Sequence, residues 1–259
     1  MAQKTENGTY MDEYGSEIEK TIKKWFEEVL EKLVDLDDEP FIDSYVRSTT
    51  GILFNYNIAT IYLIRKELRL PAMALLRIMT ELVMKFIWCF YNTTNYQEVK
   101  LKFQRWAKTA GKRKIKLLND FIETNRTSDE IKSKFIKDIQ KIEDELSNFD
   151  NSVKCMPQMT GDGGLFDQLS IVFGGNISTL TYIQFCKAIH IDTSVLACCI
   201  ERNESSLTYM GDLNIKLDDL LNHCLSNAYM FVKALHIFYK WDPCRIENEY
   251  LHIIPVTEK

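Results

Sequence analysis

The charged residues with the clearest chemical spacing lie in an otherwise apolar segment. Arg77, Glu81 and Lys85 stand four residues apart within the stretch from Pro71 to Asn92. In an α-helix this spacing stacks them on one stripe, where the Glu81 carboxylate can bridge to either cation. The rest of the segment is apolar, and a helix that is apolar on most sides is buried. Because a buried charge without a partner is very costly, this row, which we call the charged ladder, must meet polar groups from elsewhere in the chain.

A second row with the same spacing can supply those groups. Tyr182, Cys186 and His190 also stand four apart, in a segment expected to be helical. An imidazole beside a carboxylate and a guanidinium suits proton transfer when a substrate is present, with His190 as general acid or base and Glu81 orienting it. Arg77 and Tyr182 would then hold a phosphate or carboxylate. Without a substrate, the same groups form a buried hydrogen-bond network that fixes the register of two helices.

A strongly basic stretch follows the apolar segment. Positions 100–116 carry eight basic residues and no acidic one, in a chain whose net charge is −5. With aromatic side chains interleaved, such a helix can neutralise phosphates and stack on bases, as nucleic-acid binding requires. The alternative is a solvated helix face paired with the mixed-charge segment 127–149. This basic patch consists of Lys100, Lys102, Arg105, Trp106, Lys108, Lys112, Arg113, Lys114 and Lys116.

Helical periodicity dominates the chain and predicts an all-α fold. Long segments run without any of the ten Gly or five Pro, which disfavours a strand-rich fold. We expect a bundle of about seven to nine helices with 71–91 at its centre, a stacked α-solenoid being second. Residues 1–12 are expected to be a disordered tail, and 13–259 a single helical domain with a Gly-containing loop at about 150–177. Expected helices span about 13–33, 42–68, 71–92, 100–116, 127–149, 165–173, 194–202 and 213–241, with a further helix beginning near 178 and a short one after 242.

Composition predicts a cytoplasmic protein that does not enter the membrane. Its seven cysteines, an odd number without a Cys-x-x-Cys pair, are typical of reduced thiols in an apolar core. The polar, acidic N-terminus lacks the apolar region of a secretory signal. Charges inside the 71–92 segment argue against a membrane span, because each costs about 2.5–3.5 kcal/mol at the bilayer centre. No zinc-ligand spacing, nucleophile motif or complete phosphate-binding loop is present, so neither a metal nor a cofactor is expected.

The two polar rows together resemble a known sequence pattern. The run from the Tyr56–Tyr62 region through Arg77-x-x-x-Glu81, followed further along by Tyr182-x-x-Phe-x-x-x-x-His190, is similar to a bacterial family of unknown function placed near the HEPN helical-bundle nucleases. That family carries Arg-x-x-x-Glu on one helix and Tyr-x-x-hydrophobic-Ser-x-x-x-His on another. Cys186 stands where the family usually has Ser. The similarity spans roughly residues 42–200.

The resemblance implies a HEPN-like core with extra helices and an activity on RNA or nucleotides. HEPN ribonucleases work without a metal and usually carry an Arg and a His with four to six residues between them, acting at the RNA 2′-OH and scissile phosphate, commonly across a dimer interface. One such spacing joins Arg245 to His252, and these two residues are the second-choice site. The implied protein is a homodimeric endoribonuclease effector or toxin in bacterial and phage conflict, that is, in antiviral defence.

A non-enzymatic role is the alternative. A helical module that binds a protein partner or a small ligand would use the polar rows only as a structural lock. Nucleic-acid binding that weakens steeply with salt supports the first class, and its absence at low salt favours the second. The sequence alone leaves open whether the protein is an enzyme.

Overall fold

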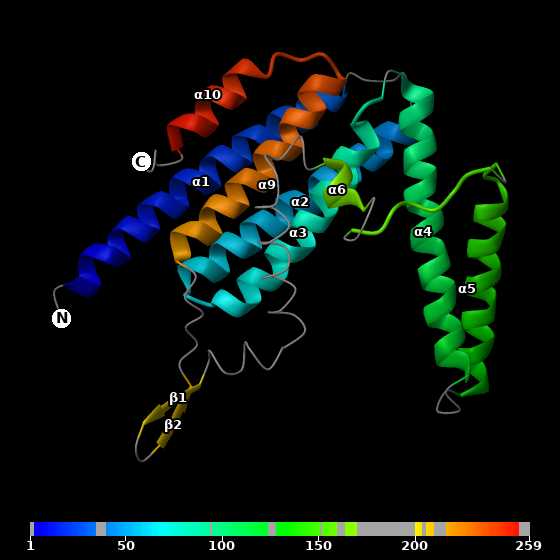
Figure 1. Cartoon of the computed structure of the whole chain (residues 1–259), viewed down its shortest axis with the longest axis horizontal. Helices are drawn as coiled ribbons and strands as arrows, with labels where there is room; N and C mark the ends of the chain where they lie inside the picture. Colours follow the sequence, from blue (N-terminus) through cyan, green and yellow to red (C-terminus); the bar gives the residue numbers. More distant parts are fainter. Residues whose placement is uncertain are drawn as a thin grey trace.

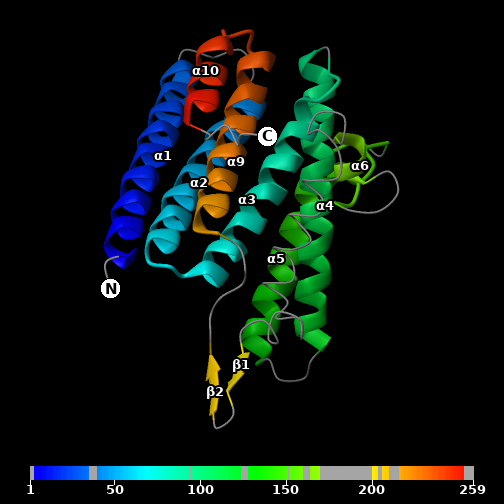
Figure 2. The same cartoon turned by 60° about the vertical axis from the view of Figure 1, so that its left-hand side comes forward.

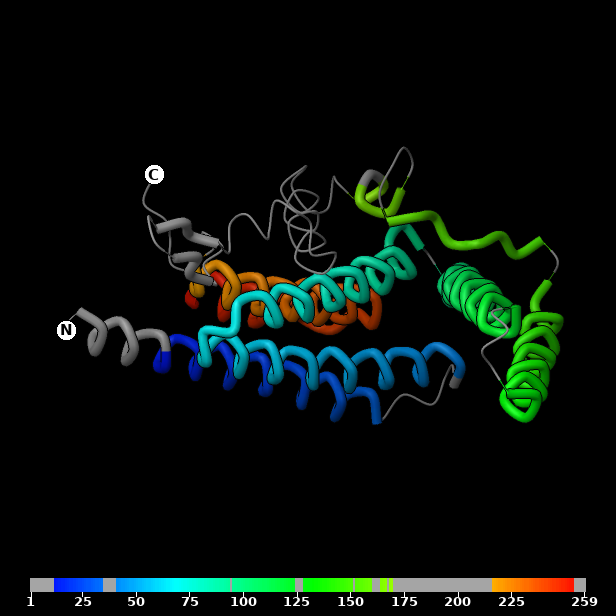
Figure 3. Tube along the Cα trace, turned by 90° about the horizontal axis from the view of Figure 1, so that it is seen from below, coloured from blue at the N-terminus to red at the C-terminus, as the bar shows by residue number. Residues whose placement is uncertain are grey.

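Four long helices lie side by side and form the body of the molecule (Figure 1). They are α1 (Gln3–Val34), α2 (Pro40–Arg65), α3 (Arg69–Phe90) and α9 (Leu217–Phe238). Figure 3 shows α1 and α2 in one layer, with α3 and α9 in a second layer against it. This computed structural model describes residues 3–34, 40–93, 95–123, 128–150, 152–159, 164–169, 200–203, 206–209 and 216–253. The protein is an all-α multi-helix bundle, as its periodicity predicts.

Shorter elements surround this body. The helices α4 (Tyr96–Glu123) and α5 (Asp129–Ser147) form a hairpin at the edge of the bundle next to α3 (Figure 2). The short helix α6 (Leu165–Leu169) packs on α3, and α10 (Cys244–Ile253) packs on α9 and α1. The strands β1 (Ile200–Asn203) and β2 (Ser206–Tyr209) pair antiparallel.

The helix α3 is central because apolar side chains cover most of its circumference. Its neighbours are α2, α9, α4 and α6, so it has packed helices on several sides. Phe86 shows the result: it is fully buried, and its ring lies 4.7 Å from Phe90, 6.0 Å from Phe103 of α4 and 4.5 Å from Phe231 of α9, measured between centroids. Aromatic pairs at these distances add to the stability gained by burying their area. One aromatic cluster thus joins three helices.

An arginine ties α2 to α1. Arg65 Nη1 donates to Glu19 Oε2 at 3.0 Å, and Arg65 Nη2 donates to the Asp12 carbonyl at 3.0 Å and to Ser16 Oγ. A Cβ on Gly15 would lie 3.2 Å from Arg65 Nε, so the missing side chain lets the guanidinium lie close on α1. The helix α1 begins at Gln3 rather than near residue 13, so it extends through most of the segment expected to be a disordered tail.

After residue 150 the structure agrees with the predicted loop in its described part and departs from the predicted helix at 194–202. The described part of the predicted loop includes 152–159, which runs without helix along α4, and the short helix α6 begins at Leu165 as expected and ends at Leu169. The helix predicted at 194–202 is wrong over its last three residues, because Ile200–Arg202 belong to β1. Their backbone pairs with β2, where Ile200 lies opposite Tyr209 and Glu201 opposite Thr208. Ile, Thr and Tyr, which occupy three of these four positions, are residue types enriched in strands.

The cysteines divide between core and surface. Among the described residues Cys89 and Cys224 are buried, whereas Cys155 and Cys244 are exposed, and all four are free thiols. Burial raises the pKa of the Cys89 and Cys224 thiols, which keeps both protonated. The prediction of apolar core thiols therefore holds for the two on α3 and α9 and is wrong for the two in connecting or terminal positions. No described helix combines the length and apolarity needed to cross a membrane.

A buried histidine stands at the end of α9. His236 Nδ1 lies 2.8 Å from the Asp242 carbonyl, to which it must donate, and the ring meets Trp241 edge-on at 5.3 Å. The other ring nitrogen, Nε2, is buried without a hydrogen-bond partner among the described residues. Burial lowers the pKa of His236 from its ordinary 6.5, outweighing the hydrogen bond to Asp242, and the charge of Lys32 lowers it further. The ring is therefore neutral in the folded protein at neutral pH.

We expect replacement of Phe86 by Ala to lower the free energy of unfolding by about 3–5 kcal/mol, because it leaves a cavity where three helices meet. Ile78→Ala, on the same helix but 36% exposed, is the control and should cost much less. Urea unfolding followed by circular dichroism measures both. Equal losses would show that the aromatic cluster is not the centre of the core.

The protein should lose stability as the pH falls below about 6.5. The unfolded chain binds a proton on His236 near the ordinary pKa of 6.5 while the folded state, with its lowered pKa, does not, so protonation favours unfolding. His236→Asn keeps a donor for Asp242 and should flatten this dependence. His252→Gln, an exposed control, should leave it unchanged. Thermal melts between pH 5 and 8 test this, and an unaltered slope in His236→Asn would contradict it.

Candidate functional site

The charged ladder forms on α3 with Glu81 in the middle. Arg77 Nη2 lies 3.2 Å from Glu81 Oε2, and Lys85 Nζ pairs with the other carboxylate oxygen, Oε1. The three side chains are only 17% to 26% exposed. Two cations thus share one carboxylate on the central helix, and solvent reaches these side chains only in part.

The ladder lies on the face of α3 that meets α6. Trp88, one helical turn after Lys85, donates its indole N–H to Gln168 Oε1 of α6 at 2.9 Å. Tyr182, Cys186 and His190 lie outside the described residues. Their pairing with Arg77 and Glu81 therefore stays a prediction.

Side chains in the first half of the basic patch form contacts within the protein. Lys102 Nζ donates to the carbonyls of Trp88, at 3.1 Å, and of Tyr91, and it stands 5.2 Å from the centre of the Trp88 ring. These carbonyls belong to the last turn of α3, where backbone acceptors lack helical partners and a cation is favoured. Burial lowers the pKa of Lys102. Lys102 thus caps the central helix.

Neighbouring members of the patch also make internal contacts. Lys108 Nζ donates to the Val153 carbonyl at 2.5 Å and holds the 152–159 segment on α4. Trp106 stacks on the buried Phe103, and its ring is packed against the core rather than free to stack on bases. Lys100 stands 5.9 Å from the ring of Phe41 in α2. Arg105 is partly buried on the same part of α4.

The second half of the patch is exposed. It lies where α4 leaves the bundle and packs against α5, a helix that has no buried residue. At this seam Gly111 faces α5, since a Cβ there would lie 3.0 Å from Leu146 Cδ1. The exposed cations are Lys112, Arg113, Lys114 and Lys116. These four are the members of the patch that can meet a polyanion without disturbing the core.

The second-choice pair lies on α10. Arg245 bonds to Glu28 of α1 and lies 3.8 Å from Glu249, which also accepts from Lys24 Nζ at 2.6 Å. His252 is exposed in the last turn of the same helix. Arg245 is thus part of an ion-pair network that holds α10 against α1. No described residue of the charged ladder contacts this network.

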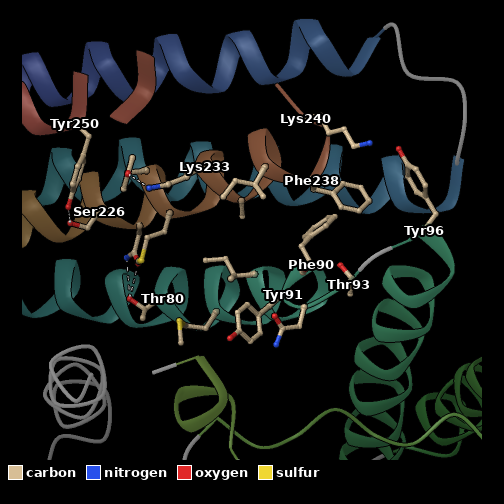
Figure 4. A pocket seen from close by; sticks show the side chains of 18 of the residues that line it. Thr80, Phe90, Tyr91, Thr93, Tyr96, Ser226, Lys233, Phe238, Lys240 and Tyr250 are labelled. Carbon is tan, nitrogen blue, oxygen red and sulfur yellow. Dashed lines mark hydrogen bonds between the residues drawn. The ribbon is translucent and has the colours of Figure 1, made fainter. Parts of the chain in front are cut away.

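A cavity of about 920 Å³ lies between α3 and α9 and is bounded by α10 (Figure 4). Its α3 wall is made by Thr80, Met84, Ile87 and Tyr91, a stripe that neighbours the charged ladder without including it. Sequence reasoning missed this cavity. The available signal was weak: a mixed polar and apolar stripe on each of two helices that are far apart in the sequence. His223 of α9 also lines the cavity, and burial lowers its pKa.

The cavity wall contains a partly buried polar pair. Asn227 Nδ2 of α9 donates to Thr80 Oγ1 of α3 at 3.1 Å, and Thr80 Oγ1 also donates to the Leu76 carbonyl at 2.8 Å. Ser226 and Tyr250 share a hydrogen bond of 3.0 Å that joins α9 to α10. Within the described part of the chain, no three His, Cys, Asp or Glu side chains gather as metal ligands would.

Comparison with known proteins identifies the family. The model of a family of unknown function, DUF5677, matches residues 43–205. The chain belongs to the DUF5677 family. No curated protein and no solved structure matches the chain. The DUF5677 match begins in α2 and ends after β1, so it includes the charged ladder, the basic patch and the positions of Tyr182 and His190, whereas α9 and α10 lie beyond it.

We expect Lys102→Met to cost about 1–3 kcal/mol of stability, because it leaves carbonyls at the end of α3 without a donor. Lys112→Met, which removes an exposed cation from the same helix, should change stability by no more than about 0.5 kcal/mol. Chemical denaturation of both variants measures the difference. If the two variants were equally stable, Lys102 would be a surface cation and not a cap.

Proposed function

We propose that this member of the DUF5677 family acts on RNA or a nucleotide at the charged ladder of α3, as a HEPN-like effector. The observation that supports the proposal is that two cations, Arg77 and Lys85, flank one carboxylate at partly buried positions on the central helix. A guanidinium in such a place can grip a phosphate through two parallel hydrogen bonds, and these are stronger where water is partly excluded.

The roles within the ladder follow from its contacts. Both carboxylate oxygens of Glu81 are engaged, one by Arg77 and the other by Lys85, so Glu81 positions its neighbours rather than taking a proton. The proton-transfer role falls to His190, as the sequence pattern implies. Tyr182 would add one hydroxyl to the phosphate. Metal-independent RNA cleavage requires no more than such an acid or base and an anion grip.

The exposed half of the basic patch is the proposed RNA-backbone contact. Lys112, Arg113, Lys114 and Lys116 lie on the part of α4 that extends beyond the core. The inner members, Lys102 and Lys108, already bind carbonyls, which removes them from this role. The proposed contact is therefore smaller than the sequence suggested.

The wider setting is proposed from the family resemblance. It comprises a cytoplasmic homodimer that cleaves RNA in antiviral defence or as a toxin. Light scattering after size-exclusion chromatography measures the dimer directly. The second candidate is a non-enzymatic module, and the α3–α9 cavity favours it because a preformed pocket of this size suits a ligand.

We expect a triple change of Lys112, Arg113 and Lys116 to Gln to weaken binding of single-stranded RNA about tenfold or more at low salt, and to lower the slope of log affinity against log salt by about two. The matched control is Lys134, Lys137 and Lys141 changed to Gln, which removes the same charge from exposed positions on α5. Fluorescence anisotropy at several salt concentrations gives both values.

The same preparations test the ladder. Arg77→Lys keeps the charge but loses the bidentate grip, so RNA cleavage or cell toxicity should fall while the melting temperature stays close to wild type. His190→Ala should abolish cleavage. If both variants melt well below wild type while their folded fraction keeps full activity, the ladder is structural. If wild type binds no RNA at low salt, the non-enzymatic module is favoured.

A further inference from the structure

The cavity between α3 and α9 has the size of a small-molecule site. Its volume of about 920 Å³ lies within the range of ligand pockets, roughly 300–1,000 Å³. Figure 4 shows side chains from α3, α9 and α10 converging on it. The cavity lining includes no residue of the charged ladder, so a ligand site here does not depend on the function proposed for the ladder.

Much of the cavity lining is apolar. It includes Met84 and Ile87 of α3 and Met230, Ala234 and Ile237 of α9. Methionine side chains are flexible and polarizable, so they adapt to apolar ligands of irregular shape. One end carries aromatic rings, among them Phe90 and Phe238, whose centroids lie 4.5 Å apart. This lining favours an elongated apolar body over a sugar or a free polar metabolite.

The charged side chains that line the cavity are cations. Lys233 and Lys240 line the cavity, and no Asp or Glu does so among the described residues. The Lys233 ammonium donates to the Tyr229 hydroxyl at 2.8 Å and to Glu247 Oε1 at 3.1 Å. Tyr229 is itself fixed by stacking on Tyr250, with centroids 4.0 Å apart and planes 8° apart. The cation is thus held at the cavity wall, and the hydrogen bond to Tyr229 raises its pKa.

We propose that this cavity binds an amphipathic organic anion, an elongated apolar molecule with one carboxylate or similar acidic group. The apolar body lies along Met84, Ile87 and Met230, and the acidic group bonds to the Lys233 ammonium. A ligand cation would find no carboxylate in the described lining, and a neutral ligand would form no ion pair with Lys233.

Glu247 makes the proposal sharply testable. Its side chain is 45% exposed and already pairs with Lys233, so it competes with a ligand acid for the same ammonium. Removing this carboxylate should therefore tighten the binding of an anion, whereas removing the ammonium should weaken it. A purely hydrophobic pocket would respond to neither change.

The experiment measures binding of decanoate, decanol and anilinonaphthalenesulfonate to the full chain by calorimetry and fluorescence. We expect Lys233→Gln to weaken decanoate about tenfold or more while decanol changes less than about threefold. Glu247→Gln should tighten decanoate by up to about fivefold. Ala234→Phe, which fills the middle of the cavity, should reduce all three ligands strongly.

Lys23→Gln and Glu27→Gln are the matched controls, since they alter an exposed ion pair on α1 and should leave affinity unchanged. The proposal is overturned if wild type shows no saturable decanoate binding, or if decanol and decanoate lose affinity equally in Lys233→Gln. It is also overturned if Ala234→Phe is folded, by its melting curve, and binds as wild type does. RNA binding and cleavage do not enter these readouts, so a failure here is separate from a failure of the ladder.

Discussion

The structure depends on burying one helix from several sides at once. The apolar circumference of α3 requires neighbours on most of its faces, and α2, α9, α4 and α6 supply them. Phe86 lies at the centre of this packing, because its ring contacts Phe103 of α4 and Phe231 of α9. The charged ladder and the cavity then occupy the two parts of α3 that this packing leaves partly open.

A polar requirement accompanies the apolar one. A helix that ends inside a bundle leaves carbonyls without partners, and such groups are expensive to bury. Lys102 meets this need at the end of α3, and its long stem lets the ammonium reach carbonyls from the neighbouring helix. Counting charges suggests that Lys102 binds nucleic acid, whereas its contacts give it a structural role. Lys108 has a similar role, because it donates to the Val153 carbonyl of the 152–159 segment.

Two groups of cations lie along the same helix. The ladder has two cations for one carboxylate, and the cavity has Lys233 and Lys240 with no acid in its described lining. They differ in their surroundings, because the ladder stands on a polar stripe whereas the cavity is mostly apolar. This difference suits a phosphate ester at the first and an amphipathic acid at the second.

The sequence determined the local features, since hydrophobic periodicity and spacing need only neighbouring residues. It placed the helices from α2 to α5 and α9, and it stacked Arg77, Glu81 and Lys85 correctly, because their contacts repeat every four residues. Only the tertiary structure shows which cations of the basic patch bond within the protein, because Lys102 of α4 reaches the Trp88 carbonyl of α3 only once the two helices pack. It also decided the cavity, whose walls on α3 and α9 come from opposite ends of the chain. The strand at Ile200 was likewise set by its partner at Tyr209, a pairing that periodicity within one segment does not contain.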